Sequence, residues 1–246
     1  MGLLNVVDAV KNEVKAAVGY QQNFTSLLGS KDIARALSMM QDRSGFAQKA
    51  LLEYRVEYHE VMKRQDKAVL DKKGNFLRWQ IPIPYQVFIN EIALVFLYGR
   101  PVKWLQRSKD TDYAFEQYNQ LLEDLRFNAH VREAKRVAGA EGTSAMLYHV
   151  YRNKEGKPAV VLNVLSKQNG DDIFLIKDQY KRLTAFAWGY YLTESGNKSV
   201  YHVDIYRDDT IYYCKRLNMG WEVRAIPNMV GKIPAIVFEQ EPEHEG

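Results

Sequence analysis

Few residues of this chain combine a type and a spacing that suit catalysis or metal binding. The 246 residues include five histidines and a single cysteine. His130 and Glu133 lie three residues apart in a segment with a helical pattern, so they would share one helix face as an acid/base or metal-binding pair. No second pair of this kind and no HExxH motif accompanies them. Pairing on the surface of a helix is therefore the favoured interpretation.

Three further candidates stand in segments with the alternation of β-strands. His149 and His202 are each flanked by tyrosine and valine, so each histidine can face solvent while its neighbours pack. Cys214 follows two tyrosines, and a lone strand cysteine is typical of a small buried hydrophobic residue. A nucleophilic pair of Cys214 with either histidine remains an alternative. A second alternative is a hydrolase or transferase site in which a histidine and two carboxylates, distant in the sequence, come together in the fold.

The acidic pairs Asp171-Asp172 and Asp208-Asp209 lie in predicted turns. Aspartate is favoured in turns because its side chain hydrogen-bonds the local backbone, and this interpretation needs no metal. The sequence contains no GxGxxG, GxxxxGK[ST] or GxSxG motif, so nucleotide binding and α/β-hydrolase chemistry lose their specific support. We therefore predict no catalytic residue, no cofactor-binding residue and no metal ligand, and we expect that the protein is not an enzyme.

The charges indicate a basic folded part with an acidic end. The net charge is +4, and because residues 239–246 carry four glutamates, residues 1–238 carry about +8. A positive electrostatic field of this kind tolerates or attracts polyanions, although it does not identify a particular partner. A basic α+β module that binds nucleic acid is therefore the alternative function. The basic clusters do not form one stripe, which favours a solvated surface; they are Lys63-Arg64, Lys72-Lys73, Arg132/Lys135/Arg136 and Lys181-Arg182.

The first part of the chain has the apolar spacing of helices. Residues 3–18 show one apolar helical face, Ser30 is expected to cap a helix over residues 33–40, and a third helix is expected from residue 46 toward residue 64. Two short apolar runs around a glycine-containing turn then predict a small hairpin over residues 68–79.

A strongly apolar helix is expected to begin after Pro84 and to end at Gly99 and Pro101. Because of its composition, we expect it to be the most buried helix of the chain. Gly99→Val and Pro101→Ala are expected to disturb its end, the first more severely if Gly99 has a positive φ. Two more helices are expected, over residues 115–125 and residues 128–139.

From residue 145 the apolar period changes to two. Residues 145–151 and 159–165 predict a hairpin with Gly156 in its turn, and a series of short strands follows over residues 173–238. Helices first and strands afterwards predict an α+β fold, with N-terminal helices followed by an antiparallel β-rich domain. The expected divisions are an N-terminal helical region (1–66), a hairpin and helical segment (67–143), a β-rich segment (144–239) and an acidic tail (240–246).

Composition is that of a globular protein with a core, since 46% of the residues are hydrophobic and 26% are charged. A single cysteine excludes an intrachain disulfide and suits a reducing compartment. The first residues do not have the pattern of a secretory signal, and the most apolar run, 92–98, is far shorter than the roughly 20 residues of a spanning helix. No membrane association is expected.

The segment 81–102 resembles a stretch of tailed-phage portal proteins of the SPP1-like family, in which a proline-initiated apolar helix ends with an aromatic residue, a glycine and an X-Pro-Val/Ile strand start. Further segments resemble the family in the same order. These are the helix pair over 118–138, the hairpin over 145–156, the paired strands over 203–212 and the closing strand Gly231-Lys232-Ile233-Pro234-Ala235-Ile236-Val237-Phe238. The resemblance covers about residues 46–239 and the part of the family called the wing.

This resemblance implies a structural subunit of a dodecameric ring at the capsid vertex, through which double-stranded DNA is packaged and ejected without sequence-specific contacts. The implied partners are other copies of the chain, the terminase, capsid or scaffold proteins and head-completion proteins. The implied location is the virion, with assembly in the host cytoplasm. Because family chains continue past the closing strand into a stem, a clip and a crown, this sequence is expected to hold the wing without those parts.

Overall fold

The computed structural model of the chain describes residues 19–20, 22–59, 62, 83–106, 112–194 and 198–240, and of Asp112 only the backbone. The predicted helix over residues 3–18 and the predicted hairpin over residues 68–79 lie outside these residues. The chain forms two compact units, one of Met1–Ser44 with Gly170–Ala235, the other of Gly45–Asn169 with Ile236–Gly246. The predicted α+β class is confirmed, because helices precede two β-sheets.

The first unit contains a six-stranded sheet with the order β1-β4-β5-β6-β7-β8, in which each pair of neighbours is antiparallel. From β4 onward the strands follow one another along the chain, as expected from the run of short apolar segments. Sequence reasoning missed β1, because two residues are too short to show a period. The strands are β1 (Gln41–Asp42), β4 (Asp172–Lys177), β5 (Leu183–Glu194), β6 (Lys198–Tyr206), β7 (Thr210–Leu217) and β8 (Gly220–Pro227).

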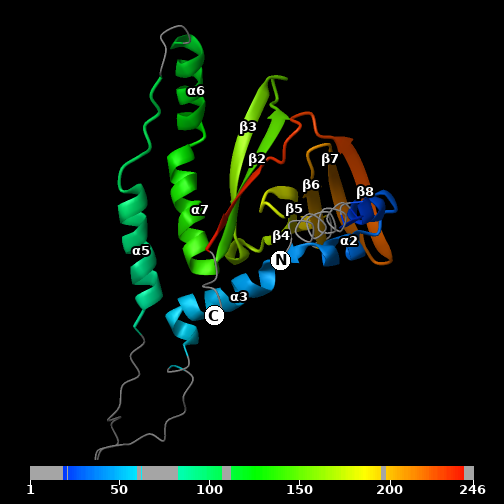
Figure 1. The fold of residues 1–246 in the computed structure, drawn as a ribbon, viewed down its shortest axis with the longest axis horizontal. Helices are drawn as coiled ribbons and strands as arrows, with labels where there is room; N and C mark the ends of the chain where they lie inside the picture. The colour runs from blue at the N-terminus through cyan, green and yellow to red at the C-terminus, as the bar shows by residue number, and fades with distance from the viewer. Residues whose placement is uncertain are drawn as a thin grey trace, which may run out of the picture. The chain divides into compact units, whose positions relative to one another are not determined.

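Two short helices cover one face of this sheet, the helix over residues 22–29 and α2 (Ile33–Met39), as the blue ribbon in Figure 1 shows. Their apolar residues form a core with strand residues that alternate along β5, β6 and β7. The N-cap of α2 is Asp32, whose carboxylate accepts the backbone N–H of Arg35 at 3.2 Å. The prediction that Ser30 caps α2 is wrong, because the Ser30 hydroxyl instead donates to the Leu27 carbonyl in the last turn of the preceding helix.

The second unit is built around one helix, α7, which lies between α5 and a β-hairpin (Figure 1). The helices predicted within the described part of this unit and the hairpin predicted over residues 145–165 are present, although α3 ends earlier than expected. A three-stranded sheet has the order β3-β2-β9. The elements are α3 (Ser44–Tyr54), η1 (Val56–Tyr58), α5 (Tyr85–Tyr98), α6 (Asp112–Asp124), α7 (Phe127–Glu141), β2 (Thr143–Arg152), β3 (Pro158–Leu165), η3 (Lys167–Asn169) and β9 (Ala235–Glu239).

The hairpin of β2 and β3 packs on α7 through a small apolar core of Ala134, Met146 and Leu162. The buried hydroxyl of Ser144 donates to the Ala134 carbonyl at 2.6 Å, which fixes β2 against the helix. The hairpin turn has Gly156 at φ 77°, as the sequence predicted. These contacts place α7 at the centre of the second unit.

The prediction that α5 is the most buried helix is wrong. Of its 14 residues only Asn90 and Leu94 are buried. The helix does end at Gly99, but Gly99 has φ −63°, so the proposed positive φ is also wrong. A side chain at Gly99 would instead meet the carbonyl oxygen of Val95.

Candidate functional site

The most unusual surface of the described chain is the outward face of α5. Six large apolar residues recur at the three- and four-residue spacing that places them on one side of a helix. All six are exposed, from 42% for Ile92 to 85% for Phe96. We call this surface the α5 stripe; it consists of Tyr85, Phe88, Ile89, Ile92, Val95 and Phe96.

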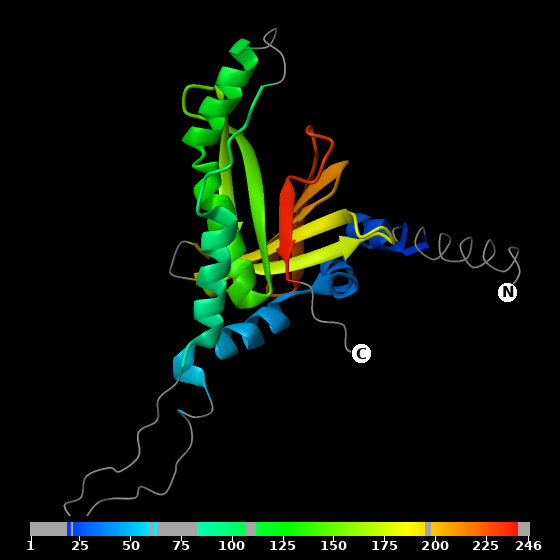
Figure 2. The ribbon, with the colours of Figure 1, turned by 60° about the vertical axis from the view of Figure 1, so that its left-hand side comes forward.

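The opposite face of α5 packs on α7 through a polar residue. The amide Nδ2 of Asn90 donates to the Arg136 carbonyl at 2.9 Å and to the Tyr54 hydroxyl at 3.4 Å. Asn90 lies against Gly139, where a Cβ would overlap its amide. The close approach of the two helices, visible from a second direction in Figure 2, therefore depends on a glycine. It turns the apolar face of α5 away from α7.

An open pocket of about 540 Å³ adjoins the first turn of the stripe. Residues from α3, η1 and the start of α5 line it, including Leu52, Tyr58, Ile83 and Tyr85. A stripe with an adjoining pocket is the geometry of a surface that takes up an apolar partner. Glu53 and His59 also line this pocket, and His59 Nε2 lies 2.7 Å from the backbone carbonyl oxygen of Glu53.

A buried carboxylate lies on the face of the first sheet that α2 does not cover. Asp204 is 4% exposed and accepts a hydrogen bond from the Tyr190 hydroxyl at 3.2 Å. Burial raises the pKa of Asp204 from 3.8 to about 7, although hydrogen bonds from Tyr190 and Tyr206 oppose part of that rise. Sequence reasoning missed this residue, although its place between Val203 and Ile205 in a strand pattern was the available signal.

His202 lies on the same sheet face, beside an aromatic stack. Its ring stacks on Tyr190 with centroids 5.6 Å apart, and Tyr190 stacks on Trp188 at 4.1 Å. Glu194 Oε1 is 3.8 Å from the His202 Nε2 atom but only 2.6 Å from Lys215 Nζ. Glu194 is therefore held mainly by the lysine.

Cys214 does not pair with His202. Cys214 lies opposite Val203 on β6, and both side chains belong to the core under the helices. His202 is the neighbour of Val203 along the strand, so it points to the other face. Burial raises the pKa of the Cys214 thiol to about 12, which makes it a poor nucleophile. His149 belongs to the second unit, and burial lowers its pKa.

The predicted roles of the acidic pairs are only partly correct. Asp208 does bond its local backbone, accepting the N–H of Asp209 at 3.0 Å. Asp171 and Asp172 also bond side chains that are remote in sequence, which the turn interpretation did not predict. Asp171 accepts the indole N–H of Trp188 at 2.8 Å, and Asp172 accepts the Tyr201 hydroxyl at 2.8 Å. These two carboxylates tie the start of β4 to side chains of β5 and β6, contacts that are remote in sequence.

Glu133 binds Arg136 instead of forming a site with His130. Two guanidinium nitrogens of Arg136 donate to the carboxylate at 2.8 and 2.5 Å. The hydrogen bond from Arg136 lowers the pKa of Glu133. Within the described ranges, no group of three or more His, Cys, Asp or Glu side chains could hold a metal ion.

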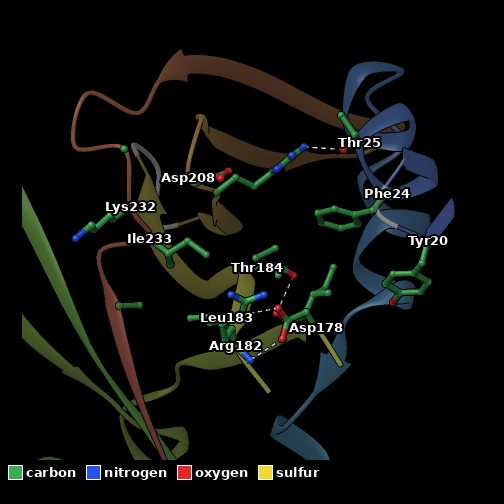
Figure 3. A pocket seen from close by; sticks show the side chains of 15 residues that line it. Tyr20, Phe24, Thr25, Asp178, Arg182, Leu183, Thr184, Asp208, Lys232 and Ile233 are labelled. Atoms are coloured by element: carbon green, nitrogen blue, oxygen red, sulfur yellow. Dashed lines mark hydrogen bonds and ion pairs between the residues drawn. The ribbon is translucent and has the colours of Figure 1, made fainter. Parts of the chain in front are cut away.

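A pocket of about 550 Å³, lined by both apolar and charged side chains, lies in the first unit (Figure 3). Its charged groups have both signs and several are already engaged. Asp178 accepts Arg182 Nε at 2.7 Å, and Arg207 donates to the Thr25 hydroxyl at 2.7 Å. The pocket therefore does not present one charge to a ligand.

The two basic clusters that the structure describes lie in different units, one on α7 and one in the β4–β5 turn. Arg136 on α7 binds Glu133, and Arg182 in the β4–β5 turn binds Asp178. Lys63-Arg64 and Lys72-Lys73 lie outside the described residues.

The family model described as phage portal protein, SPP1 Gp6-like, matches residues 44–246. The chain belongs to this phage portal protein family. The resemblance inferred from the sequence is thereby confirmed. Portal family proteins are structural and typically not enzymes, and the family implies an oligomeric ring.

The portal family match includes α5, α6, α7 and the β2–β3 hairpin, and so the whole α5 stripe. Comparison with curated proteins gives no match. None of the described helices is long and apolar enough to cross a membrane. In this portal-family chain, the α5 stripe is an exposed apolar surface within the matched region.

Proposed function

We propose that the chain is a structural subunit of a portal ring at the capsid vertex, where the ring forms the passage for packaging and ejection of double-stranded DNA. The observation that carries this proposal is the portal family match over residues 44–246. The proposed role is mechanical, without catalysis. Other copies of the chain, the terminase, capsid or scaffold proteins and head-completion proteins are its proposed partners, and the virion is its proposed location.

The charges of the chain are compatible with this role. A net charge of about +8 over residues 1–238 suits a protein that works beside packed DNA. Arg136 and Arg182 are held by carboxylates, so they are less available for phosphates. A DNA passage benefits from this, because every tightly bound phosphate would resist translocation.

Electron microscopy of the purified full chain tests the proposal. We expect ring-shaped particles with a central channel, and a mass by light scattering that is a multiple of the chain mass of 28.5 kDa. A particle population without any ring would contradict it.

Binding to short DNA duplexes, measured by fluorescence anisotropy at several salt concentrations, tests the alternative of a nucleic-acid-binding module. Under the portal proposal, binding is weak, independent of sequence and lost with added salt. Tight, sequence-selective binding by a monomer would overturn the portal proposal in favour of that module.

A further inference from the structure

We infer that the α5 stripe is a contact surface for a second copy of this chain. This inference rests on the proposed ring function for its partner, but the surface itself comes from the geometry of α5. The stripe residues are Tyr85, Phe88, Ile89, Ile92, Val95 and Phe96.

The amphipathic pattern of α5 is inverted relative to the unit it belongs to. In a surface helix the apolar stripe normally faces the core and polar residues face solvent. In α5 the buried residues are Asn90 and Leu94, while the large apolar residues lie outside. On the inner face the Asn90 amide donates to the Tyr54 hydroxyl and the Arg136 carbonyl, so rotating the helix would break these hydrogen bonds and expose Leu94. The stripe is therefore fixed in its outward orientation.

The exposed apolar area lies at the upper end of what the surface of a monomer shows. With side chains of roughly 150–200 Å² each, the six exposed fractions leave on the order of 600 Å² in contact with water. The largest patch of a typical monomer is about 300–600 Å². Covered by an equal area of a partner, the stripe would bury about 1,200 Å², which is the lower end of specific, stable interfaces.

The chemistry of the stripe selects an apolar and permanent partner. Glu91 is the only charged residue of α5, and it lies outside the stripe. DNA is excluded as the partner, because phosphates require cations or hydrogen-bond donors. Permanent interfaces between subunits are the more apolar class, and a ring supplies a second copy at high local concentration.

The pocket beside Tyr85 adds a shape argument. Its volume of about 540 Å³ is sufficient for large side chains of a partner. Anchor residues that enter such pockets supply much of the energy of an interface. In a closed ring the contact is between two different faces, so the stripe of one copy meets a surface outside α5 on the next.

Photo-crosslinking at Phe96 tests the inference directly. Phe96→Cys places a thiol at the most exposed position of the stripe, and a benzophenone maleimide attached there reacts with any nearby C–H group. The native Cys214 is 1% exposed, so labelling is selective. The matched control is Met219→Cys, at an exposed position in the β7–β8 turn of the other unit.

We expect the Phe96→Cys probe, and not the Met219→Cys probe, to give dimer-sized adducts. Mixing heavy- and light-isotope chains identifies adducts between copies by mass spectrometry. Adducts confined to the same chain would overturn the inference, because a segment of that chain would then cover the stripe. Adducts from one α5 to another α5 would support a self-contact but contradict a ring.

A pair of substitutions provides the second measurement. Phe88→Asp with Phe96→Asp places charges in the stripe at exposed positions, and Met219→Asp is the control. The stripe variant is expected to self-associate at least about tenfold more weakly than the parent, with unchanged circular dichroism and melting temperature. Rings that persist at parental strength in the stripe variant would overturn the inference and leave the portal function standing. A parent that stays monomeric at every concentration would also overturn the inference.

Discussion

The side chain of Asn90 on α5 packs directly on the backbone of Gly139 on α7, and no side chain would fit between them. This contact buries an amide where an apolar residue would be expected. The buried amide group has hydrogen-bond partners, because its Nδ2 donates to the Arg136 carbonyl and to the Tyr54 hydroxyl. The outward orientation of the apolar stripe follows from this single crossing point.

Gly139→Ala is expected to lower the free energy of unfolding by about 1–3 kcal/mol, because the new Cβ would push Asn90 and α5 away from α7. Gly45→Ala is the control, since Gly45 lies in α3 with open space around it. That variant is expected to be unchanged or up to about 1 kcal/mol more stable. Urea unfolding followed by circular dichroism compares the two. Equal stability of Gly139→Ala and the parent would show that α5 and α7 do not cross at this point.

Glu141→Gln is expected to destabilise the chain by about 1–3 kcal/mol. The buried carboxylate of Glu141 accepts the backbone N–H groups of Lys167 at 2.7 Å and of Gln168 at 3.0 Å, at the start of η3. A glutamine has only one oxygen to accept them, so one buried N–H loses its partner. Thermal melts of this variant beside Glu155→Gln, an exposed turn residue, give the comparison. A parental melting temperature for Glu141→Gln would contradict the prediction.

Stability is expected to fall as the pH rises from about 5 to about 7.5. Because burial raises the folded-state pKa of Asp204 from 3.8 to about 7, the folded chain keeps a proton in this window that the unfolded chain has lost. For this residue the loss amounts to about 2 kcal/mol. Asp204→Asn removes the titrating group and keeps an acceptor for Tyr190.

We expect denaturant titrations at each pH to show that the advantage of Asp204→Asn over the parent grows by about 2 kcal/mol between pH 5 and pH 7.5. Asp208→Asn, at an exposed residue, is the control and should follow the parent. An advantage that does not change with pH would mean that Asp204 does not titrate in this range.

The Cys214 thiol is expected to react with a disulfide reagent only as fast as the chain unfolds. It is buried in the core of the first unit, and burial raises its pKa to about 12, so little thiolate is present at neutral pH. Labelling rates followed by absorbance, with and without denaturant, measure this. Complete labelling of the native chain within seconds would place the thiol at the surface.

The sequence by itself determined the local elements and the family. Apolar spacing placed α5, α6 and α7, and period-two alternation placed the β2–β3 hairpin with Gly156 in its turn. These signals are local, because helix and strand geometry repeat over a few residues. The resemblance to portal proteins pointed to the family, and the family match over residues 44–246 confirmed the membership.

Only the tertiary structure decided which side of each element is buried and which side is exposed to solvent. The spacing of Phe88, Ile92, Val95 and Phe96 predicted an apolar helix side, but the direction of that side depends on Asn90 meeting Gly139, a contact across 49 positions of sequence. Asp171 and Asp172 likewise found partners on β5 and β6 that no local pattern contains. Periodicity specifies a face, whereas burial depends on the neighbour that the fold places against it.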